Sequence, residues 1–428
     1  MVESLFWRKV LARSGIGGLL PSVRRALLGG EAHLSRFSDR LLAAPLADLV
    51  DAALLPAAGT PDAIDLAMGT PRCGLGPAIR GLPVHRPPSA WGDPELRGEL
   101  ADRLRTDQGL SCDPADEVLI THGGTGAFAT VLDAFVNPGD RAVLFDPTAP
   151  IFPIGLKHRR ASVAWVPTRS EDGILRFDMT AFGKAIRGAK LLVLVDPANP
   201  TGGAFAAEDL EQIAFWARKA DALIYHDVSF DPWRARPAAA RLASLPHAEG
   251  RMLVAGSYAK SHGLTAARVG WLAGDRHLVR PCAVAAALAA PFVPPVCQHL
   301  ALHAERGGTE AQTEMRTEFG RRRHYVRERL ETMGLKPWAS AAGFFYWVPV
   351  PGTETGREFA GRLYRETGVL VNPGHPFGPS GDRFVRISFA TDEGRVGEGL
   401  NRLAAFVARP FEMTEDGVSD RMSADAVT

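Results

Sequence analysis

The sequence predicts an α/β protein whose central sheet is mainly parallel. From about residue 115 onward, short β-rich runs alternate with helical segments, which is the order typical of strands joined by crossover helices. The run Lys190–Val195 is apolar after its first residue, as expected of a strand that is buried on both faces. Glycine-rich or polar stretches follow several of these runs, and parallel sheets bind ligands beyond the carboxyl ends of their strands.

The elements of this pattern follow one another in a regular order. A strand over Glu117–Thr121 precedes a glycine run and a helix that ends at about Phe135, and a second helix is expected over Glu208–Ala220. The further strands are expected at Arg141–Phe145, Ala161–Val166, Lys190–Val195, Leu223–His226, Met252–Ala255 and Val269–Ala273. This order predicts that the segments after these strands meet at one edge of the sheet.

The length of 428 residues predicts two domains rather than one. We expect a helical extension at 1–60, a large domain at 61–310, a small α+β domain at 311–410 and a disordered tail at 411–428, with 61–90 contributing partly to the small domain or to an interface. A long helix over Glu310–Met333 is expected to link the two domains. The elements expected in the small domain are Gly343–Val348, Arg357–Thr367, Phe384–Ala390 and a helix to Arg409.

The composition excludes several classes of protein. With 49 Lys+Arg against 48 Asp+Glu, the chain lacks the charge excess that gathers nucleic acid or coats an anionic membrane. The four cysteines are scattered without metal-binding spacing, so neither a disulfide framework nor a metal site is expected. We therefore expect a cytoplasmic protein with reduced thiols and without nucleic-acid or membrane partners.

Two apolar stretches need a separate explanation. The N-terminus lacks a continuous apolar run that ends in a small-residue cleavage site, so no signal peptide is expected. The uncharged stretch Pro281–Gln298 is broken by Pro291, Pro294 and Pro295. It is expected to form two short helices with a buried turn rather than a membrane span.

The segment Gly256–Trp271 carries the most specific chemistry. Lys260 follows Ser257 by three residues and precedes Arg268 by eight, with small residues between them. A lysine with a tuned pKa forms a Schiff base with an aldehyde, while a hydroxyl and a guanidinium hold a phosphate. An aldehyde that carries a phosphate is pyridoxal 5'-phosphate. A lone lysine is ordinarily a solvated side chain, but these glycines and small residues are not the composition of an exposed helical face.

Five further residues fit the same cofactor or its substrate, although the segment of each, taken alone, has an ordinary structural explanation. Gly124 and Thr125 lie in a glycine-rich turn between a strand and a helix, which suits a phosphate but is also a common tight connection. Asn199 lies in the turn Asp196–Gly203 after the buried strand. Asp227 ends an apolar strand, where a lone aspartate is more often a cap. Arg386 lies on a strand, where an arginine can capture a carboxylate or form a surface ion pair.

From Leu66 to Val407, these motifs and their order resemble the class I/II aminotransferases of fold type I, a large domain with a mainly parallel sheet and a smaller α+β domain. The resemblance implies that the large domain binds pyridoxal 5'-phosphate. It implies that Lys260 forms the catalytic Schiff base and transfers the proton, that Asp227 contacts the ring nitrogen and that Asn199 contacts the ring oxygen. It also implies that Gly69 and Arg386 bind the substrate. The residues implied to hold the phosphate are Gly124, Thr125, Ser257 and Arg268. It also implies a homodimer.

Three positions depart from the family pattern. Ala149 occupies the place of an aromatic residue that usually stacks on the cofactor ring, and Phe152 is the nearby alternative. Phe230 stands where a tyrosine usually hydrogen-bonds the ring oxygen. The tyrosine that a partner subunit often lends to the phosphate is absent, and His85, Arg86 and Trp91 lie in that neighbourhood.

The predicted reaction is the transfer of an amino group between an amino acid and a 2-oxo acid. Ala149 and Phe230 leave open another pyridoxal-phosphate reaction on the same site, namely that of a lyase, a decarboxylase or an oxidase. A third reading, an effector-binding domain of a transcription regulator, lacks support because residues 1–60 show no helix-turn-helix and no basic recognition helix. The identity of the amino donor stays open. The apolar stretch Val284–Val296 offers no second arginine and argues against aspartate or glutamate, whereas Arg72, His85 and Arg86 could hold a polar or acidic side chain.

Overall fold

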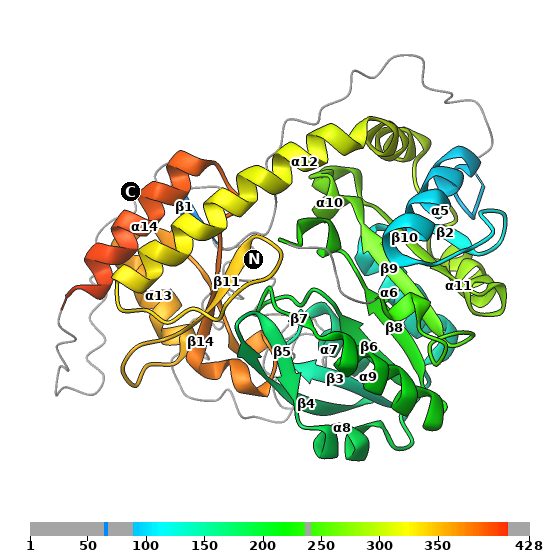
Figure 1. The fold of residues 1–428 in the computed structure, drawn as a ribbon, viewed down its shortest axis with the longest axis horizontal. Coiled ribbons are helices and arrows are strands. Elements are labelled where there is room, and N and C mark those ends of the chain that lie inside the picture. The colour runs from blue at the N-terminus through cyan, green and yellow to red at the C-terminus, as the bar shows by residue number, and fades with distance from the viewer. Residues whose placement is uncertain (1–63, 67–88, 236–240, 410–428) are drawn as a thin grey trace, which may run out of the picture.

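The computed structural model describes residues 64–66, 89–235 and 241–409 (Figure 1). The expected extension at 1–60 and the expected tail at 411–428 lie outside the described residues. The described part consists of a large unit around a nine-stranded sheet and a smaller unit around a three-stranded sheet. No helix within these described ranges is long and apolar enough to cross a bilayer.

The large sheet is mainly parallel, as the sequence predicts. Its order is β2-β10-β9-β8-β6-β3-β4-β5-β7. The central neighbours β9, β8, β6, β3 and β4 run parallel, while β10 runs antiparallel to both β2 and β9. The strands are β2 (Val118–His122), β3 (Arg141–Asp146), β4 (Ser162–Glu171), β5 (Ile174–Phe177), β6 (Leu191–Val195), β7 (Ala204–Phe205), β8 (Leu223–Asp227), β9 (Met252–Ser257) and β10 (Val269–Gly274).

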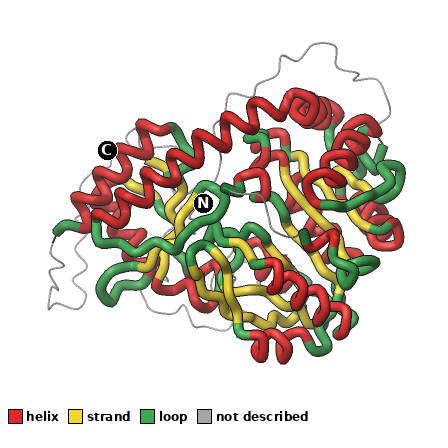
Figure 2. Tube along the Cα trace, in the orientation of Figure 1, coloured by secondary structure: helices red, strands yellow, loops and turns green. Residues whose placement is uncertain are grey.

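Helices cover both faces of this sheet, as the tube in Figure 2 also shows. On β6, Leu192 and Leu194 belong to one hydrophobic cluster, and Leu191 and Val193 belong to the other, because successive side chains of a strand point to opposite faces. The first cluster includes α5 (Pro94–Gln108), α8 (Met179–Ile186) and α9 (Ala207–Lys219). The second includes α6 (Gly123–Phe135), α7 (Ile151–His158) and α11 (Arg276–Ala289). The continuously apolar β6 is therefore buried on both faces, as its sequence predicts.

The small unit lies at the other end of a long helix, α12 (Pro295–Thr332), which crosses the molecule in Figure 1. Its three-stranded sheet has the order β11-β14-β13 and is antiparallel. The elements are β11 (Phe345–Pro349), α13 (Gly356–Thr367), β12 (Val369–Leu370), β13 (Asn372–Pro373), β14 (Phe384–Ser388) and α14 (Glu393–Val407), and β1 (Ile64–Asp65) pairs with β12. Because α12 is continuous through residue 310, the proposed domain boundary there would fall inside a helix.

The stretch 281–298 differs from its expected structure. It contains the end of α11 and the start of α12, but α12 is 38 residues long, and the turn between them is largely exposed. Phe292 is 41% exposed, and Val293 at 2% is the buried residue of that turn. The expectation of two short helices with a buried turn is therefore wrong, because α12 continues well past the apolar stretch and the turn lies on the surface.

Candidate active site

The register of β10 brings the glycine-rich turn and the lysine segment together. On β10, Gly270 lies opposite Thr121 of β2 on one side and opposite Ser257 of β9 on the other. The turn after β2 and the turn after β9 are therefore neighbours, although they are more than 130 positions apart in the chain. This is the edge of the sheet at which the sequence predicts a ligand.

The glycines of this edge let Arg268 and Ser257 approach the turn after β2 closely. A Cβ atom on Gly123 would lie 2.7 Å from Nη2 of Arg268, and one on Gly124 would lie 3.5 Å from Cβ of Ser257. Thr125 is exposed on the same first turn of α6, whose start has no side-chain cap. Backbone N–H groups at an uncapped helix start attract anions, so Gly124, Thr125, Ser257 and Arg268 together suit a phosphate.

Lys260 lies beside this cradle, on the single helical turn α10 (Tyr258–Ser261) that follows β9. Burial, reinforced by the positive charges of Arg386 and Arg268, lowers the pKa of its amine to about 8, while Asp227 acts in the opposite direction. The carbonyl oxygen of Lys260 accepts a hydrogen bond of 2.9 Å from Nε1 of Trp233. The amine is therefore held on a fixed turn and is partly neutral near physiological pH.

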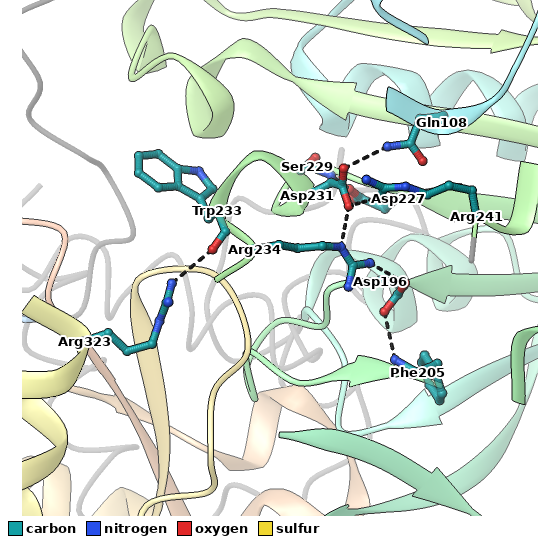
Figure 3. Close-up of polar contacts among 10 residues, drawn as sticks. All are labelled: Gln108, Asp196, Phe205, Asp227, Ser229, Asp231, Trp233, Arg234, Arg241 and Arg323. Atoms are coloured by element: carbon teal, nitrogen blue, oxygen red, sulfur yellow. Dashed lines mark hydrogen bonds and ion pairs between the residues drawn. The ribbon is translucent and has the colours of Figure 1, made fainter. Parts of the chain in front are cut away.

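Asp227 is the last residue of β8 and is partly buried. The backbone N–H of Ser229 donates to its Oδ1 at 2.8 Å, and Figure 3 shows these two residues side by side. Burial raises the pKa of Asp227, whereas hydrogen bonds from Ser229 and the charge of Lys260 lower it. A carboxylate in such a place gains most from a cationic partner, and the protonated nitrogen of a pyridine ring is one.

Arg386 reaches this edge from the small sheet. It lies on β14, and its Nη1 donates to Oδ1 of Asn199 at 2.9 Å, just beyond the end of β6. Its guanidinium carbon lies 5.4 Å from the ring centre of Phe345 and 5.2 Å from that of Phe377. The two rings hold the planar guanidinium by cation–π contact and fix its orientation, and a planar guanidinium suits a carboxylate.

The segment around Asn199 is anchored by a network of ion pairs that Figure 3 shows. Asp196 accepts from Nη2 of Arg234 at 2.6 Å and from the backbone N–H of Phe205 at 3.0 Å. Arg234 also donates to Asp231, which in turn accepts from Gln108. These contacts tie the turn after β6 to the turn after β8, and they have a structural role.

Several expectations have a different outcome. Gly69 of the predicted substrate-binding pair lies outside the described residues, as do His85 and Arg86. Ala149 is buried in the hydrophobic cluster of α6 and α7. Phe152 lies buried in the same cluster, with its ring 4.9 Å from that of Phe128 and 6.0 Å from that of Tyr225, and its contact with the cofactor stays a prediction.

Phe230 and Trp91 also lie in packed surroundings. The ring of Phe230 packs 5.1 Å from that of Phe345, the ring that the guanidinium of Arg386 also contacts. Trp91 lies against the cluster of α6, and its carbonyl accepts from the backbone N–H of Ile120 at 3.0 Å. At position 230, the structure therefore has an apolar contact with the small unit where the family pattern has a phenol.

The sequence did not single out Tyr225, Ser229 or Trp233, yet each borders the predicted site. The hydroxyl of Tyr225 is buried and has no hydrogen-bond partner among the described residues. Tyr225 precedes Asp227 by two residues on β8, so both side chains point to the same face of the sheet. This spacing of two on a buried strand is the signal that could have identified it.

Pyridoxal phosphate fits these residues. The glycine turn with Arg268 and Ser257 suits its phosphate, the amine of Lys260 suits its aldehyde, and the partly buried carboxylate of Asp227 suits its ring nitrogen. The unpartnered hydroxyl of Tyr225 is a further polar atom at the same edge. The phosphate, the aldehyde and the ring nitrogen of the cofactor would therefore each find a residue of matching charge or hydrogen-bonding character.

The comparisons with known proteins agree with this chemistry. An LL-diaminopimelate aminotransferase of Dehalococcoides mccartyi is 28% identical over 331 residues, which cover 75% of this chain and 83% of that protein. An aspartate aminotransferase of Pyrococcus abyssi is 29% identical over 362 residues, with 81% of this chain and 92% of that protein covered.

The fold shows the same relationship. The solved structure of a Thermus thermophilus aspartate aminotransferase double mutant is similar with a TM-score of 0.75 and 27% identity, over 87% of this chain and 99% of that one. The model of the family "Aminotransferase class I and II" matches residues 79–403. The chain therefore belongs to the class I and II aminotransferases, and it is a pyridoxal-phosphate-dependent enzyme of fold type I.

Proposed function

We propose that Lys260 carries the cofactor as a Schiff base and that the enzyme thereby moves an amino group between an amino acid and a 2-oxo acid. The observation that carries this proposal is the convergence of Lys260, Asp227 and Arg386 at one edge of the sheet, beside the glycine cradle. When bound, pyridoxal phosphate supplies an aldehyde for the amino group and a ring that withdraws electrons from the substrate's α-carbon.

Lys260 is proposed to act as the proton carrier of the reaction. With a pKa of about 8, its amine exists in both the neutral and the protonated form near neutral pH. A group with a pKa close to the working pH can both accept and return a proton, which is what general acid–base catalysis requires. The contact between its carbonyl and Trp233 keeps this turn in place while the amine moves the proton.

The other residues are proposed to bind and orient. Asp227 keeps the ring nitrogen protonated, because a partly buried carboxylate favours a cation beside it. Asn199 donates its amide to the ring oxygen and at the same time fixes Arg386, whose guanidinium binds the α-carboxylate of the substrate. Gly124, Thr125, Ser257 and Arg268 hold the phosphate, and Gly69 is proposed to approach the substrate.

The test of this proposal combines a covalent label with product analysis. Borohydride treatment of the loaded enzyme should fix the cofactor to the peptide that contains Lys260, and Lys260→Ala should abolish the product. The relatives are named for LL-diaminopimelate and aspartate, so these two amino acids are the first donors in a screen for 2-oxo acid formation. Release of ammonia, carbon dioxide or peroxide without amino-group transfer would instead indicate a lyase, a decarboxylase or an oxidase.

We also propose that the enzyme is a homodimer. The outer face of α11 and the following turn expose Val284 at 58%, Leu288 at 85% and Phe292 at 41%, within a stretch that has no charged residue from 281 to 298. Surfaces of this kind mark protein–protein contacts, and a two-fold interface uses the same patch of each copy of the chain.

The dimer proposal is tested by size-exclusion chromatography with light scattering. Leu288→Glu should shift the protein to a monomer, and Ile174→Glu is the matched control, since Ile174 is 39% exposed on β5, away from α11. A dimer that survives Leu288→Glu would contradict this interface. We further propose a cytoplasmic location, in which the free thiols of Cys112, Cys282 and Cys297 stay reduced.

A further inference from the structure

A second buried carboxylate lies at the same edge of the sheet. Asp146 is the last residue of β3, and it is 2% exposed. Both of its oxygens accept hydrogen bonds from one residue of the small unit: the backbone N–H of Ser380 donates to Oδ2 at 3.0 Å, and its hydroxyl donates to Oδ1 at 2.9 Å. Two positions further along, the N–H of Thr148 donates to the carbonyl of Phe377 at 2.8 Å. The end of β3 thus holds the segment 377–380 at two points.

The approach of the two segments depends on Gly378. Its φ is 141°, a conformation that side chains rarely allow. A Cβ atom at this position would lie 2.2 Å from Oδ1 of Asp146 and 3.2 Å from the ring of Trp165. The carboxylate therefore occupies the space that a side chain would take, and the loop can close on β3 only with glycine here.

The segment that Asp146 holds is the one that supports Arg386. Phe377 is 2% exposed, and its ring centre lies 5.2 Å from the guanidinium carbon of Arg386 and 5.4 Å from the ring centre of Trp347. Trp347 lies on β11, directly opposite Arg386 of β14. A shift of Phe377 would remove one of the two rings between which the guanidinium is held.

The charge of Asp146 strengthens this contact. Burial raises the pKa of its carboxyl, and the two hydrogen bonds from Ser380 act in the opposite direction. Hydrogen bonds to a carboxylate are stronger than those between neutral groups. The segment around Ser380 is therefore bound to the large unit by more than a loose surface contact.

We propose that Asp146 is a positioning residue for the substrate: through Ser380 and Phe377 it fixes the guanidinium of Arg386 in the place where it captures the α-carboxylate. This inference rests on the proposed role of Arg386. Asp146 itself does not touch the substrate, and it acts across the contact between the two units. The contact of Asp146 with Ser380 joins the end of β3 to the small unit, and in this way it supports a substrate-binding residue from a distance.

The test uses the loaded enzyme with the variants Ser380→Ala and Ser380→Thr. Ser380→Ala removes the hydroxyl donor and keeps the backbone donor, so KM for the amino acid should rise about 3- to 10-fold, the effect of one lost hydrogen bond, with kcat changed less. Ser380→Thr keeps the hydroxyl and should restore KM. Asp146→Ala, which removes both acceptor oxygens, should raise KM at least as much as Ser380→Ala.

A binding measurement separates positioning from a merely structural role. The unreactive acid 3-phenylpropanoate, followed by the change in cofactor absorbance, should bind Ser380→Ala about 3- to 10-fold more weakly than wild type. Its amide, which lacks the carboxylate, should bind both proteins equally. Unchanged binding of the acid to Ser380→Ala would overturn the inference. Failure of borohydride to label Lys260 in the wild-type enzyme would overturn the proposed function instead, so the two failures are distinguishable.

Discussion

The lowered pKa of Lys260 can be measured in the cofactor-free enzyme. The amine reacts with acylating reagents only in its neutral form, so its rate of labelling follows its deprotonation. In a peptide the pKa is 10.5, and in the folded protein burial together with Arg386 and Arg268 lowers it to about 8. Raising the pH should therefore switch on labelling of Lys260 with a midpoint near 8.

The expected size of the effect follows from this difference in pKa. At about 1.36 kcal/mol for each step of one in pKa, the protein disfavours the protonated amine by about 3 kcal/mol. At pH 8, about half of the Lys260 amines are neutral, against about 0.3% for a lysine with the peptide pKa. For equal intrinsic reactivity and access, Lys260 should then be labelled roughly 150-fold faster than such a lysine.

The assay is brief labelling with acetic anhydride across a pH series, followed by mass spectrometry of the peptide that contains Lys260. Lys157, an exposed lysine on α7, is the internal reference in the same digest. Arg386→Gln should raise the midpoint because it removes a positive charge, and Asp227→Asn should lower it because it removes a negative one. A wild-type midpoint near 10.5, or a shift of both variants in the same direction, would refute the reasoning.

Three other changes have outcomes that follow from single contacts. Asp227→Asn should retain the cofactor and reduce kcat by more than about 100-fold, as steady-state kinetics would show, because the ring nitrogen loses its counter-charge. Glu305→Gln should lower the free energy of unfolding in urea by about 3 kcal/mol at pH 7, because it leaves the guanidinium of Arg103, 3.0 Å from the Glu305 carboxylate, buried without its partner. Arg103 lowers the pKa of Glu305, so the advantage of the wild type is complete above the unfolded value of about 4.5 and should be lost as the pH falls below it. Gly123→Ala should weaken cofactor binding in an absorbance titration and cost about 1 kcal/mol of stability, because φ is 69° and the new methyl group meets Arg268; unchanged affinity would argue against the phosphate cradle.

The sequence by itself determined which segments of the chain meet to form the site. The glycine turn, Asn199 and Lys260 each follow a strand and Asp227 ends one, and the carboxyl ends of parallel strands share one edge of a sheet, so their meeting could be predicted without coordinates. The apolar run of β6 likewise predicted burial on both faces, because the alternation of side chains along a strand is a local property. Such features depend on residues that are close together in the chain.

The tertiary structure alone decided which distant residues support that edge. The contacts of Arg386 with Asn199 and of Asp146 with Ser380 join positions 187 and 234 apart in the chain. The pairing of such positions depends on how the small unit packs on the large sheet, and no local periodicity encodes it. The tertiary structure also decided that the turn at Phe292 is exposed. The composition of this segment shows that it is apolar, but not whether another part of the chain covers it.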